Sequence, residues 1–526
     1  LDRDMPPVEL SGLEEGLQYR NELGADCCDV WQKPSDGQWM MRVKKGAEVS
    51  IAKALKFNRN IAGQIPTGWD ARRFGLPEDI ATGVDPVTLY TLVSTVEALM
   101  AAGLSDPYEL YQYVHVSEVG NTSGGGMGGM RSLKRLFHQR ALDEDIPSDT
   151  LAESFINTMP AWVNMLLMSS SGPIKTPVGA CATAAESLDI GMETILSGKA
   201  RVVIAGGYDD FGEEGSYEFA QMGATNNTDL DSGRGRTVRE SSRPMSSSRA
   251  GFVESQGAGM QVLMDAELAL EMGAPIFAVL ALTSTATDKQ GRSIPAPGRG
   301  ILTSARESSS GAAPSPLLSL ERRRAGLKME LEALESLNKQ KSDAEGEDAA
   351  FFERLIQRRR AAALETWGQG FFKNDPSIAP LRGALAVYGL GVDDLGVASF
   401  HGTSTKLNDT NESGVLNKQM EHLGRSKGNV LFVVAQKYLT GHPKGAACAW
   451  MLNGLIQCMN DARVPGNRNL DNVDVKLQKN SYLVYPNEPV ELPKIEAALL
   501  KSFGFGQAGA EVVIVHPDRL LATLSK

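Results

Sequence analysis

Two long stretches of this chain, residues 51–285 and 373–520, alternate short apolar runs with helical segments and glycine-rich turns. That order is typical of α/β proteins, in which buried strands alternate with helices. Residues 201–207 (RVVIAGG) are expected to form a buried strand, and residues 182–198 the helix before it. Three more strand-like runs lie at residues 394–400, 430–435 and 511–515. We therefore predict an α/β fold.

The composition changes between the two stretches. Residues 301–372 are rich in Glu, Arg, Lys, Ala and Leu, and their apolar residues recur at helical spacing. This pattern predicts a charged insertion of two helices, joined by the polar tract 339–348. The chain is accordingly divided into a lead-in or linker segment, an N-terminal half, a helical insertion and a C-terminal half, at residues 1–54, 55–300, 301–372 and 373–526.

Charge and cysteine content exclude several classes of protein. The net charge of −11 argues against a general nucleic-acid binder, which would normally be basic. The five cysteines form no CxxC pair, so neither a zinc ribbon nor a disulfide framework is indicated, and a reducing, cytoplasmic location is expected. No apolar run reaches 18 residues, so no membrane span is expected. The start at Leu1 is interpreted as that of a piece of a longer polypeptide.

Cys181 is the first candidate for chemistry. It lies in TPVGACAT (176–183), a turn directly before a predicted helix. The positive end of the helix dipole is expected to lower the pKa of such a thiol and to raise its thiolate fraction. A single cysteine is more often a packing residue, so the interpretation depends on partners elsewhere in the chain.

Two of the six histidines provide those partners. His401 follows a predicted strand in SFHGTST (399–405), and His442 follows another in KYLTGHPKGAA (437–447). A glycine beside each histidine permits a tight turn that projects the imidazole from a strand end, where α/β folds usually build their sites. The turn at Cys181 and the turn at His442 are both rich in Gly and Ala, and each directly precedes a predicted helix. This similarity indicates that the fold consists of two duplicated halves.

These segments, together with SFGFGQAG (502–509), stand in the order and approximate spacing of β-ketoacyl synthases. Over residues 55–520 the chain resembles the ketoacyl synthase region of the fungal type I fatty acid synthase α subunit. The segments that carry this closer resemblance are VIAGGYDDFGEEG (203–215), TATDKQGRSIPAPGRGILT (285–303) and VPGNRNLDNVD (464–474).

The resemblance implies a thiolase-like fold of five αβαβα layers, made of two duplicated halves. The first half would carry the nucleophile and the second half the histidine pair. The implied reaction is decarboxylative Claisen condensation of an acyl-enzyme thioester with malonyl-acyl carrier protein, in fatty acid elongation.

The resemblance also implies a role for each residue of the site. Cys181 would take the acyl group and His401 and His442 would handle the malonyl group, with Lys437 supporting the second histidine. Thr403 and Thr405 would line the pantetheine channel. The remaining candidates are Phe505, as the gating aromatic whose amide joins that of Cys181 in an oxyanion hole, and Met127, in a glycine cluster at the acyl pocket.

Partners and cofactors follow from the same resemblance. We expect an acyl carrier protein domain as partner, a homodimer within a larger αβ synthase complex, and no bound metal or redox cofactor, because the substrates are carried on phosphopantetheine. Two departures from the family concern the surroundings of the site: Met451 stands where many relatives have a Glu partner for the lysine, and Gln256 stands where many have Glu.

Three alternatives remain open from the sequence. The same domain could come from a dedicated fungal synthase that makes a short acyl starter for a polyketide. A thiolase is less favoured, because GFG is followed by Gln507-Ala-Gly rather than by a second cysteine. A catalytically inactive scaffold subunit is less favoured because the nucleophile is present.

Overall fold

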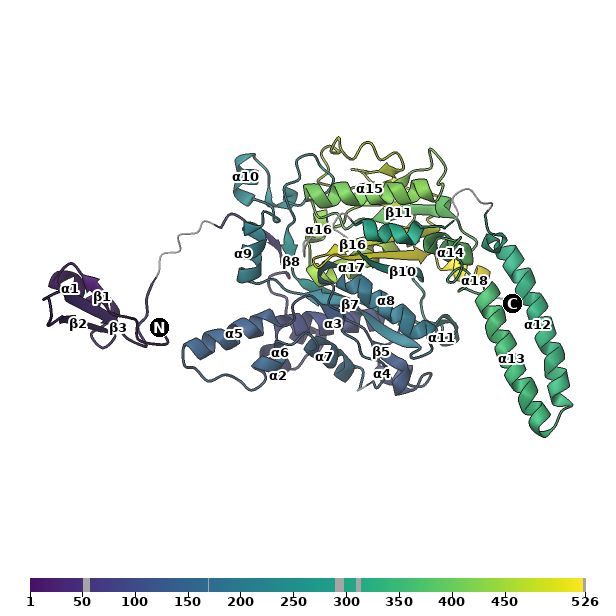
Figure 1. Cartoon of the computed structure of the whole chain (residues 1–526), viewed down its shortest axis with the longest axis horizontal. Helices are drawn as coiled ribbons and strands as arrows, with labels where there is room; N and C mark the ends of the chain where they lie inside the picture. Colours follow the sequence, from purple (N-terminus) through teal and green to yellow (C-terminus); the bar gives the residue numbers. More distant parts are fainter. Residues whose placement is uncertain (51–56, 169, 289–297, 309–313, 524–526) are drawn as a thin grey trace. The chain divides into compact units, whose positions relative to one another are not determined.

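The computed structural model (Figure 1) describes residues 1–50, 57–168, 170–288, 298–308 and 314–523. Its Cα positions divide into two compact units. The smaller unit comprises Leu1–Phe57 with Arg131–Ser154, and the larger one Asn58–Met130 with Phe155–Lys526. The larger unit holds every candidate site residue.

The smaller unit has a fold of its own where a lead-in segment was expected. The strands β1 (Val8–Leu10), β3 (Trp39–Val43) and β2 (Cys28–Gln32) form an antiparallel sheet in that order. The helix α1 (Leu13–Leu23) contacts this sheet, and Leu10, Cys28 and Met41 form the buried core. Residues 51–54 lie outside the described part of the chain. The smaller unit also includes α5 (Met130–Ala141) from residue 131 onward and α6 (Thr150–Glu153).

The first sheet of the larger unit is built around β7 (Val202–Asp209), all of whose residues are buried. β5 (Val119–Asn121) and β6 (Gly124–Gly125) pair parallel with β7, and β9 (Gly257–Met264) pairs antiparallel with it. A continuous apolar run is what a strand covered on both faces requires, so the strand predicted from VVIA is confirmed.

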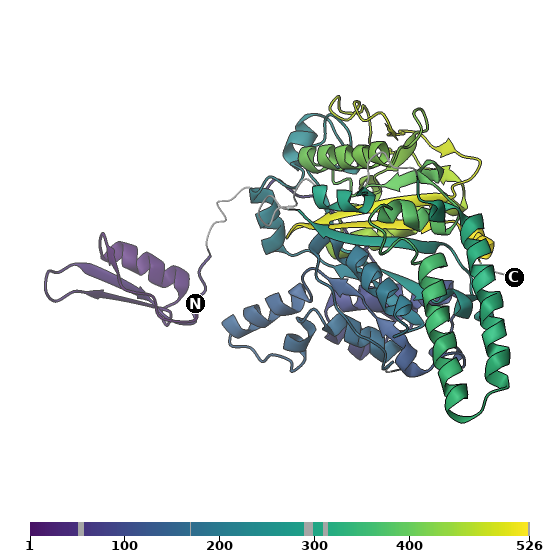
Figure 2. The ribbon, with the colours of Figure 1, turned by 45° about the vertical axis from the view of Figure 1, so that its right-hand side comes forward.

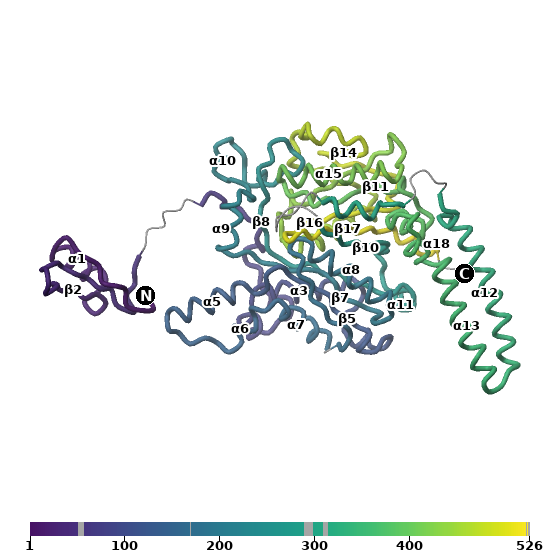
Figure 3. The backbone as a smooth tube through the Cα atoms, in the orientation of Figure 1, coloured from purple at the N-terminus to yellow at the C-terminus, as the bar shows by residue number. Residues whose placement is uncertain are grey.

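The second sheet has six strands, and its predicted strands near residues 394–400, 430–435 and 511–515 are present. Its order is β10 (Val279–Thr287), β17 (Ala508–Val515), β16 (Ala497–Gly504), β11 (Leu395–Ser399), β12 (Leu431–Val434) and β14 (Leu483–Val484). Figure 3 shows β10 beside the C-terminal strands. The sequence division placed residues up to 300 in the first half, but β10 pairs with β17, so the two sheets divide before residue 279.

Helices cover both sheets and fill the space between them. α8 (Thr183–Leu196) and α17 (Ala447–Asn460) contact each other and strands of both sheets, and their small residues form a shared buried cluster. α3 (Pro86–Ala101) and α7 (Thr158–Leu166) pack on the first sheet. On the second sheet lie α14 (Pro380–Val387) and α15 (Lys406–His422). The predicted helix before β7 is therefore present as α8.

The charged segment forms a helical hairpin. α12 (Leu320–Ser342) and α13 (Gly346–Trp367) pack side by side and run antiparallel (Figures 1 and 2). The link between them, residues 343–345, is shorter than the polar tract predicted, because α12 continues through Lys339 and Lys341. No helix in the described ranges is both long and apolar enough to cross a membrane.

Candidate active site

Cys181 lies in a sharp turn directly before α8, as the sequence predicted. It occupies the 3₁₀ turn η3 (Ala180–Ala182), which runs directly into α8, and Ala180 has a positive φ of 49°. The end of β16 approaches this turn so closely that a Cβ at Gly504 would lie 2.3 Å from the carbonyl oxygen of Gly179. The thiol is consequently almost completely buried.

Burial is the main influence on the pKa of this thiol. Desolvation, with a smaller contribution from the Asp209 carboxylate, raises the pKa of Cys181 to about 12. Lys437, Lys444 and the backbone N–H of Phe505 act in the opposite direction. The lowered thiol pKa expected from the sequence is therefore wrong for this environment, and the resting sulfur is a protonated thiol.

His442 stands directly beside the sulfur. Its Nε2 lies 3.0 Å from Cys181 Sγ. The backbone of His442 is fixed from both sides, since its N–H donates to the Val253 carbonyl and its own carbonyl accepts from Ser255. Burial lowers the pKa of this imidazole well below its usual value, and Lys437 and Lys444 lower it further. A neutral imidazole in this position is a base for the thiol proton.

His401 faces His442 across the site. The two rings are perpendicular, with centroids 5.1 Å apart. His401 Nδ1 lies 3.5 Å from Lys437 Nζ and 3.2 Å from Ser502 Oγ. The Ser502 hydroxyl donates to the Cys181 carbonyl. Burial and Lys437 lower the His401 pKa, so the ring is neutral. The Lys437 ammonium beside Nδ1 favours the tautomer in which Nε2 carries the hydrogen.

Lys437 supports His401 rather than His442. Its Nζ donates to the carbonyl of His401 at 2.6 Å and lies 3.1 Å from the Met451 sulfur. The Glu412 carboxylate accepts the backbone N–H groups of His401 and Gly402. Burial is the main influence on both charges: it lowers the pKa of Lys437 to about 8 and raises that of Glu412 to about 8. The peptide of His401 is thus held between a buried carboxyl group and a buried amine.

Glu412 is a residue of the candidate site that the sequence interpretation missed. It lies on α15 and is fully buried, and it is the leading charge that favours protonated Lys437 in place of the family's usual glutamate at position 451. The sequence around Glu412 contains no motif that would indicate its contact with the His401 peptide. The second departure from the family, Gln256 in place of Glu, also has its hydrogen bonds. The Gln256 side chain donates to Asp210 and accepts the Ile65 N–H.

Phe505 belongs to a series of aromatic rings that ends at His442. Its ring centroid lies 5.8 Å from that of Phe219, which lies 5.4 Å from that of Phe252. Phe252 in turn meets His442 edge-on at 5.4 Å. Phe219 and Phe252 stand in unremarked parts of the sequence, and only the fold brings them here.

The threonines lie in the turn between His401 and α15, and Met127 lies in a glycine loop. Thr403 and Thr405 are joined through their hydroxyl groups at 3.0 Å, and Thr405 caps α15 by accepting the Asn408 N–H. Met127 lies in the glycine loop after β6, with 39% of its surface exposed, and its N–H donates to Asp209.

The reacting groups also form a set of metal ligands. Within the ranges that the structure covers, Cys181, His401 and His442 are the His, Cys and acidic residues whose ligand atoms converge, all within 4.8 Å of one another. One sulfur and two imidazole nitrogens suit Zn²⁺.

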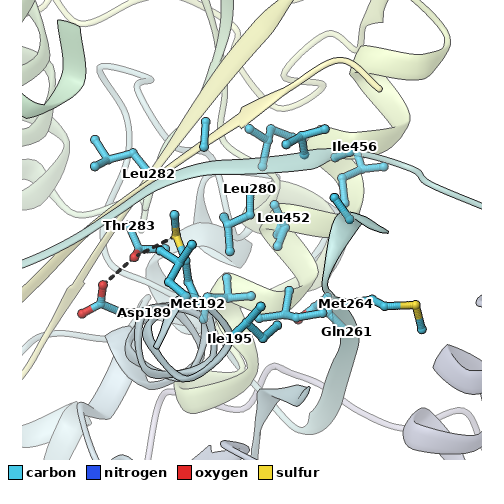
Figure 4. A pocket seen from close by; sticks show the side chains of 18 of the residues that line it. Asp189, Met192, Ile195, Gln261, Met264, Leu280, Leu282, Thr283, Leu452 and Ile456 are labelled. Atoms are coloured by element: carbon cyan, nitrogen blue, oxygen red, sulfur yellow. Dashed lines mark hydrogen bonds between the residues drawn. The ribbon is translucent and has the colours of Figure 1, made fainter. Parts of the chain in front are cut away.

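The large crevice of the molecule lies elsewhere. It has a volume of about 2210 Å³ and is lined by α3, α8, β9, β10 and α17 (Figure 4). Its wall is mainly apolar, including Met192, Leu280 and Ile456, and Thr283 bonds to Asp189 at its side. Because neither Cys181 nor a histidine lines it, this crevice is not the reacting site.

Comparison with known proteins identifies the family of the chain. The family model for the β-ketoacyl synthase N-terminal domain matches residues 16–269, and that for the C-terminal domain matches residues 373–471. The chain belongs to the β-ketoacyl synthase family. It is accordingly an acyltransferase, and the resemblance inferred from the motifs is confirmed.

Fungal fatty acid synthase α subunits are among the curated proteins that this chain is similar to. The chain is 55% identical over 548 residues to the fatty acid synthase subunit alpha of Candida albicans and 53% identical over 544 residues to that of Saccharomyces cerevisiae. In both comparisons all of this chain is covered, but it spans only 29% of the relative's length. Among solved structures, the noncanonical ketosynthase FabY from P. aeruginosa matches with a TM-score of 0.69 and 21% identity, covering 99% of this chain and 71% of that one. This match establishes a ketosynthase fold.

Proposed function

We propose that this chain condenses an enzyme-bound acyl group with malonyl-acyl carrier protein, as the elongation step of fatty acid synthesis. The observation that carries the proposal is the approach of two neutral imidazoles to one buried thiol, with His442 Nε2 at 3.0 Å from Cys181 Sγ. The identity to fungal fatty acid synthase α subunits supports the pathway.

Acyl loading comes first. His442 Nε2 takes the thiol proton as Cys181 Sγ attacks the thioester carbonyl of the acyl carrier. The tetrahedral oxyanion is stabilised by the backbone N–H groups of Cys181 and Phe505. The carrier thiolate then leaves with the proton from His442, and the acyl group remains on Sγ.

Decarboxylation and bond formation follow. The C–CO₂ bond of the malonyl group breaks, and its electron pair becomes an enolate. The enolate oxygen accepts N–H from His401 and from His442, which takes the tautomer with its hydrogen on Nε2 once acylation has removed the thiol proton. The enolate carbon attacks the acyl carbonyl on Cys181, and the carbon–sulfur bond breaks. The Cys181 thiolate takes a proton from solution, leaving CO₂ and a β-ketoacyl carrier thioester.

The surroundings of the two steps have separate tasks in this proposal. Lys437 keeps Nδ1 of His401 an acceptor, so that Nε2 donates. Thr403 and Thr405 line the channel for phosphopantetheine, which is carried by the substrate and is not a resident cofactor. Phe505 gates the pocket, and Met127 lies at the acyl end.

The fold is proposed to consist of two duplicated halves in five αβαβα layers, with the charged hairpin inserted in the second half after β10. The turns support this: η3 precedes the 14-residue α8, and η8 (Lys444–Ala446) precedes the 14-residue α17. The first residue of each turn has nearly the same positive φ, 49° at Ala180 and 48° at Lys444.

The partners are an acyl carrier protein domain, a second copy of this domain, and the remainder of a cytoplasmic αβ synthase complex. The second copy is supported by the outer edge of the first sheet. Residues 172–178 bond to β5 through Asn121, while Ile174 and Val178 are 52% and 56% exposed there. Apolar side chains on a sheet edge are suited to a symmetric contact.

Mass spectrometry of Cys181 after incubation with acyl-carrier thioesters of graded length tests this function. We expect loading by acyl carriers, and release of CO₂ and a β-ketoacyl product once malonyl carrier is added. A preference for only the shortest acyl groups would favour the starter synthase for a polyketide. Absence of loading on folded protein would contradict the proposal.

A further inference from the structure

Asp209 is a buried carboxylate that none of the proposed steps uses. It is the last residue of β7 and is 1% exposed. A carboxylate in this position is costly unless its oxygens accept hydrogen bonds. The groups that it binds are therefore informative.

The Asp209 side chain joins two segments that are far apart in sequence. Its oxygens accept the backbone N–H groups of Gly126 and Met127, each at 3.1 Å. Oδ2 also accepts the N–H of Gly445 at 2.7 Å. The first segment carries Met127, and the second is the turn Lys444–Ala446, which begins two residues after His442.

The glycines around Asp209 leave no space for another arrangement. A Cβ at Gly126 or at Gly445 would lie 2.8 Å from Asp209 Oδ2, and a Cβ at Gly207 would lie 2.1 Å from the carbonyl oxygen of Gly445. Backbone therefore packs directly on the carboxylate from both sides. The side chain of Met127 remains 39% exposed, so its position depends on the anchored backbone.

We propose that Asp209 is a positioning residue for acyl selectivity, which ties the loop carrying Met127 to the turn that follows His442. The inference rests on the proposed function, in which Met127 lies at the acyl pocket. With the tie intact, the end of the pocket is fixed relative to the histidine. With the tie weakened, the Met127 loop shifts and admits acyl groups that the intact pocket rejects.

The charged state of Asp209 gives a second way to test the tie. The charged and titratable groups around it are Lys444, which also pairs with Glu254, and Cys181 and Tyr208. Burial raises the pKa of Asp209 to about 6, although Lys444 and the three N–H donors oppose this. A protonated carboxyl group must turn its O–H toward one of those donors, so the tie should loosen below pH 6.

The experiment measures acyl loading of Cys181 by mass spectrometry, with short and long acyl thioesters in competition, at pH 5.5 and 7.5. The variants are Asp209→Asn and Met127→Ala. The matched control is Asp210→Asn, which makes the same change at the adjacent buried carboxylate, whose Oδ1 accepts from Gln256 and from the Phe211 N–H instead. Circular dichroism verifies that each variant is folded.

At pH 7.5 we expect Asp209→Asn to change the ratio of long to short acyl loading about 5- to 30-fold, in the same direction as Met127→Ala. The wild type should show the same shift at pH 5.5, and Asp209→Asn should show no further shift there. If Asp209→Asn does not fold, the wild-type shift with pH decides the question.

Three results overturn the inference, and they differ in what they imply. An altered ratio in Met127→Ala, with wild-type ratios in Asp209→Asn, would show that the pocket is correctly placed and that Asp209 does not position it. An unchanged ratio in Met127→Ala would instead remove the assignment of the acyl pocket to Met127, and the inference with it. An equal effect of Asp210→Asn would also overturn the inference, since any change at this strand end would then suffice.

Discussion

Burial shifts the pKa values of Cys181 and His442 in directions that oppose a thiolate–imidazolium ion pair. The thiol pKa is raised to about 12 and the imidazole pKa is lowered, so a proton moves from sulfur to nitrogen only at a cost. The positive end of α8, Lys437 and Lys444 reduce this cost, and the oxyanion formed next is stabilised by N–H donors. The groups around Cys181 therefore stabilise charges that form during the proposed reaction, and they do not stabilise a thiolate in the resting enzyme.

The roles of the thiol and the imidazoles should be separable. Cys181→Ala removes the acyl acceptor, so condensation should be abolished, while both imidazoles remain to stabilise the enolate and CO₂ release from malonyl carrier should persist. His401→Ala should retain acyl loading and lower CO₂ release about 10²- to 10³-fold, because one donor is lost. Loading is measured by mass spectrometry and CO₂ with labelled malonyl carrier.

The result that contradicts this division is specific. If folded Cys181→Ala loses CO₂ release as completely as His401→Ala does, the sulfur itself takes part in decarboxylation. Ser502→Ala serves as a milder comparison, since it removes one of the two groups near His401 Nδ1 and leaves Lys437 in place.

Met451→Glu should extend activity to higher pH. Burial lowers the pKa of Lys437 to about 8, so the wild-type ammonium is lost above that pH and activity should fall there. In the wild type the Met451 sulfur lies 3.1 Å from Lys437 Nζ. A carboxylate at that position favours the ammonium form of Lys437 and raises its pKa. The alkaline limb of kcat/KM should therefore shift upward by about one pH unit or more.

Met451→Gln is the control, because it adds a polar group of the same size without the charge. Its alkaline limb should remain near that of the wild type. An equal upward shift in both variants would mean that polarity rather than charge controls Lys437, and no shift in either would mean that another group titrates.

Zn²⁺ should inhibit the free enzyme and spare the acyl-enzyme. The Cys181 sulfur and the two imidazoles converge within 4.8 Å, and metal binding must displace the thiol proton. Inhibition should therefore tighten up to about tenfold per pH unit and be reversed by a chelator. Mg²⁺, which prefers oxygen ligands, is the control. If enzyme loaded beforehand with an acyl group is inhibited equally, the metal acts at another site.

At the scale of elements, local sequence predicted what depends on local sequence. β7 and α8 were found because an apolar run and a small-residue helix carry their own periodicity, and the motifs identified Cys181, His401 and His442. Glu412 was not found, since its role depends on where α15 places it against the His401 peptide. The pairing of β10 with β17 is equally non-local, and the fold of residues 1–50 depends on a very small core.

The helical hairpin should be dispensable for chemistry. Its base is fixed by Arg323, whose guanidinium donates to the Leu317 and Ala386 carbonyls and lies 4.4 Å from the Phe371 ring centre, and by Trp367 packed on Gly326. Replacing residues 328–360 by a short Gly-Ser linker keeps these contacts. Acyl loading of Cys181 should stay within about twofold of wild type.

The measurement is loading by mass spectrometry, with the mass of the full-length synthase complex determined in parallel, where we expect weaker assembly. Arg323→Ala in the full-length hairpin is the comparison, because it disturbs the base instead of the tip. Loss of loading in the shortened protein, with the melting temperature retained, would place the hairpin in the site after all.

At the scale of the whole molecule, each half contributes what the other lacks. The proposed nucleophile, Cys181, comes from the turn before α8. His401 and His442 come from the second half, in the turns before α15 and α17. Ser502 on β16 bonds to the Cys181 carbonyl and lies beside His401, so the second sheet connects both. A shift between the halves would therefore change reactivity before it unfolded either sheet.

A second copy of the chain should bind along the outer edge of the first sheet. Residues 172–178 bond to β5 on one side, and in the described part of the chain no named strand pairs with their other side. Ile174→Asp introduces a charge among exposed apolar side chains and should convert a dimer to a monomer at micromolar concentration, because a symmetric contact suffers the change twice. Val475→Asp, at an apolar residue that is 74% exposed elsewhere, is the control and should leave the mass unchanged. Light scattering coupled to gel filtration reports the mass. A wild-type protein that is monomeric, or an Ile174→Asp variant that stays dimeric, would show that this edge is not the contact.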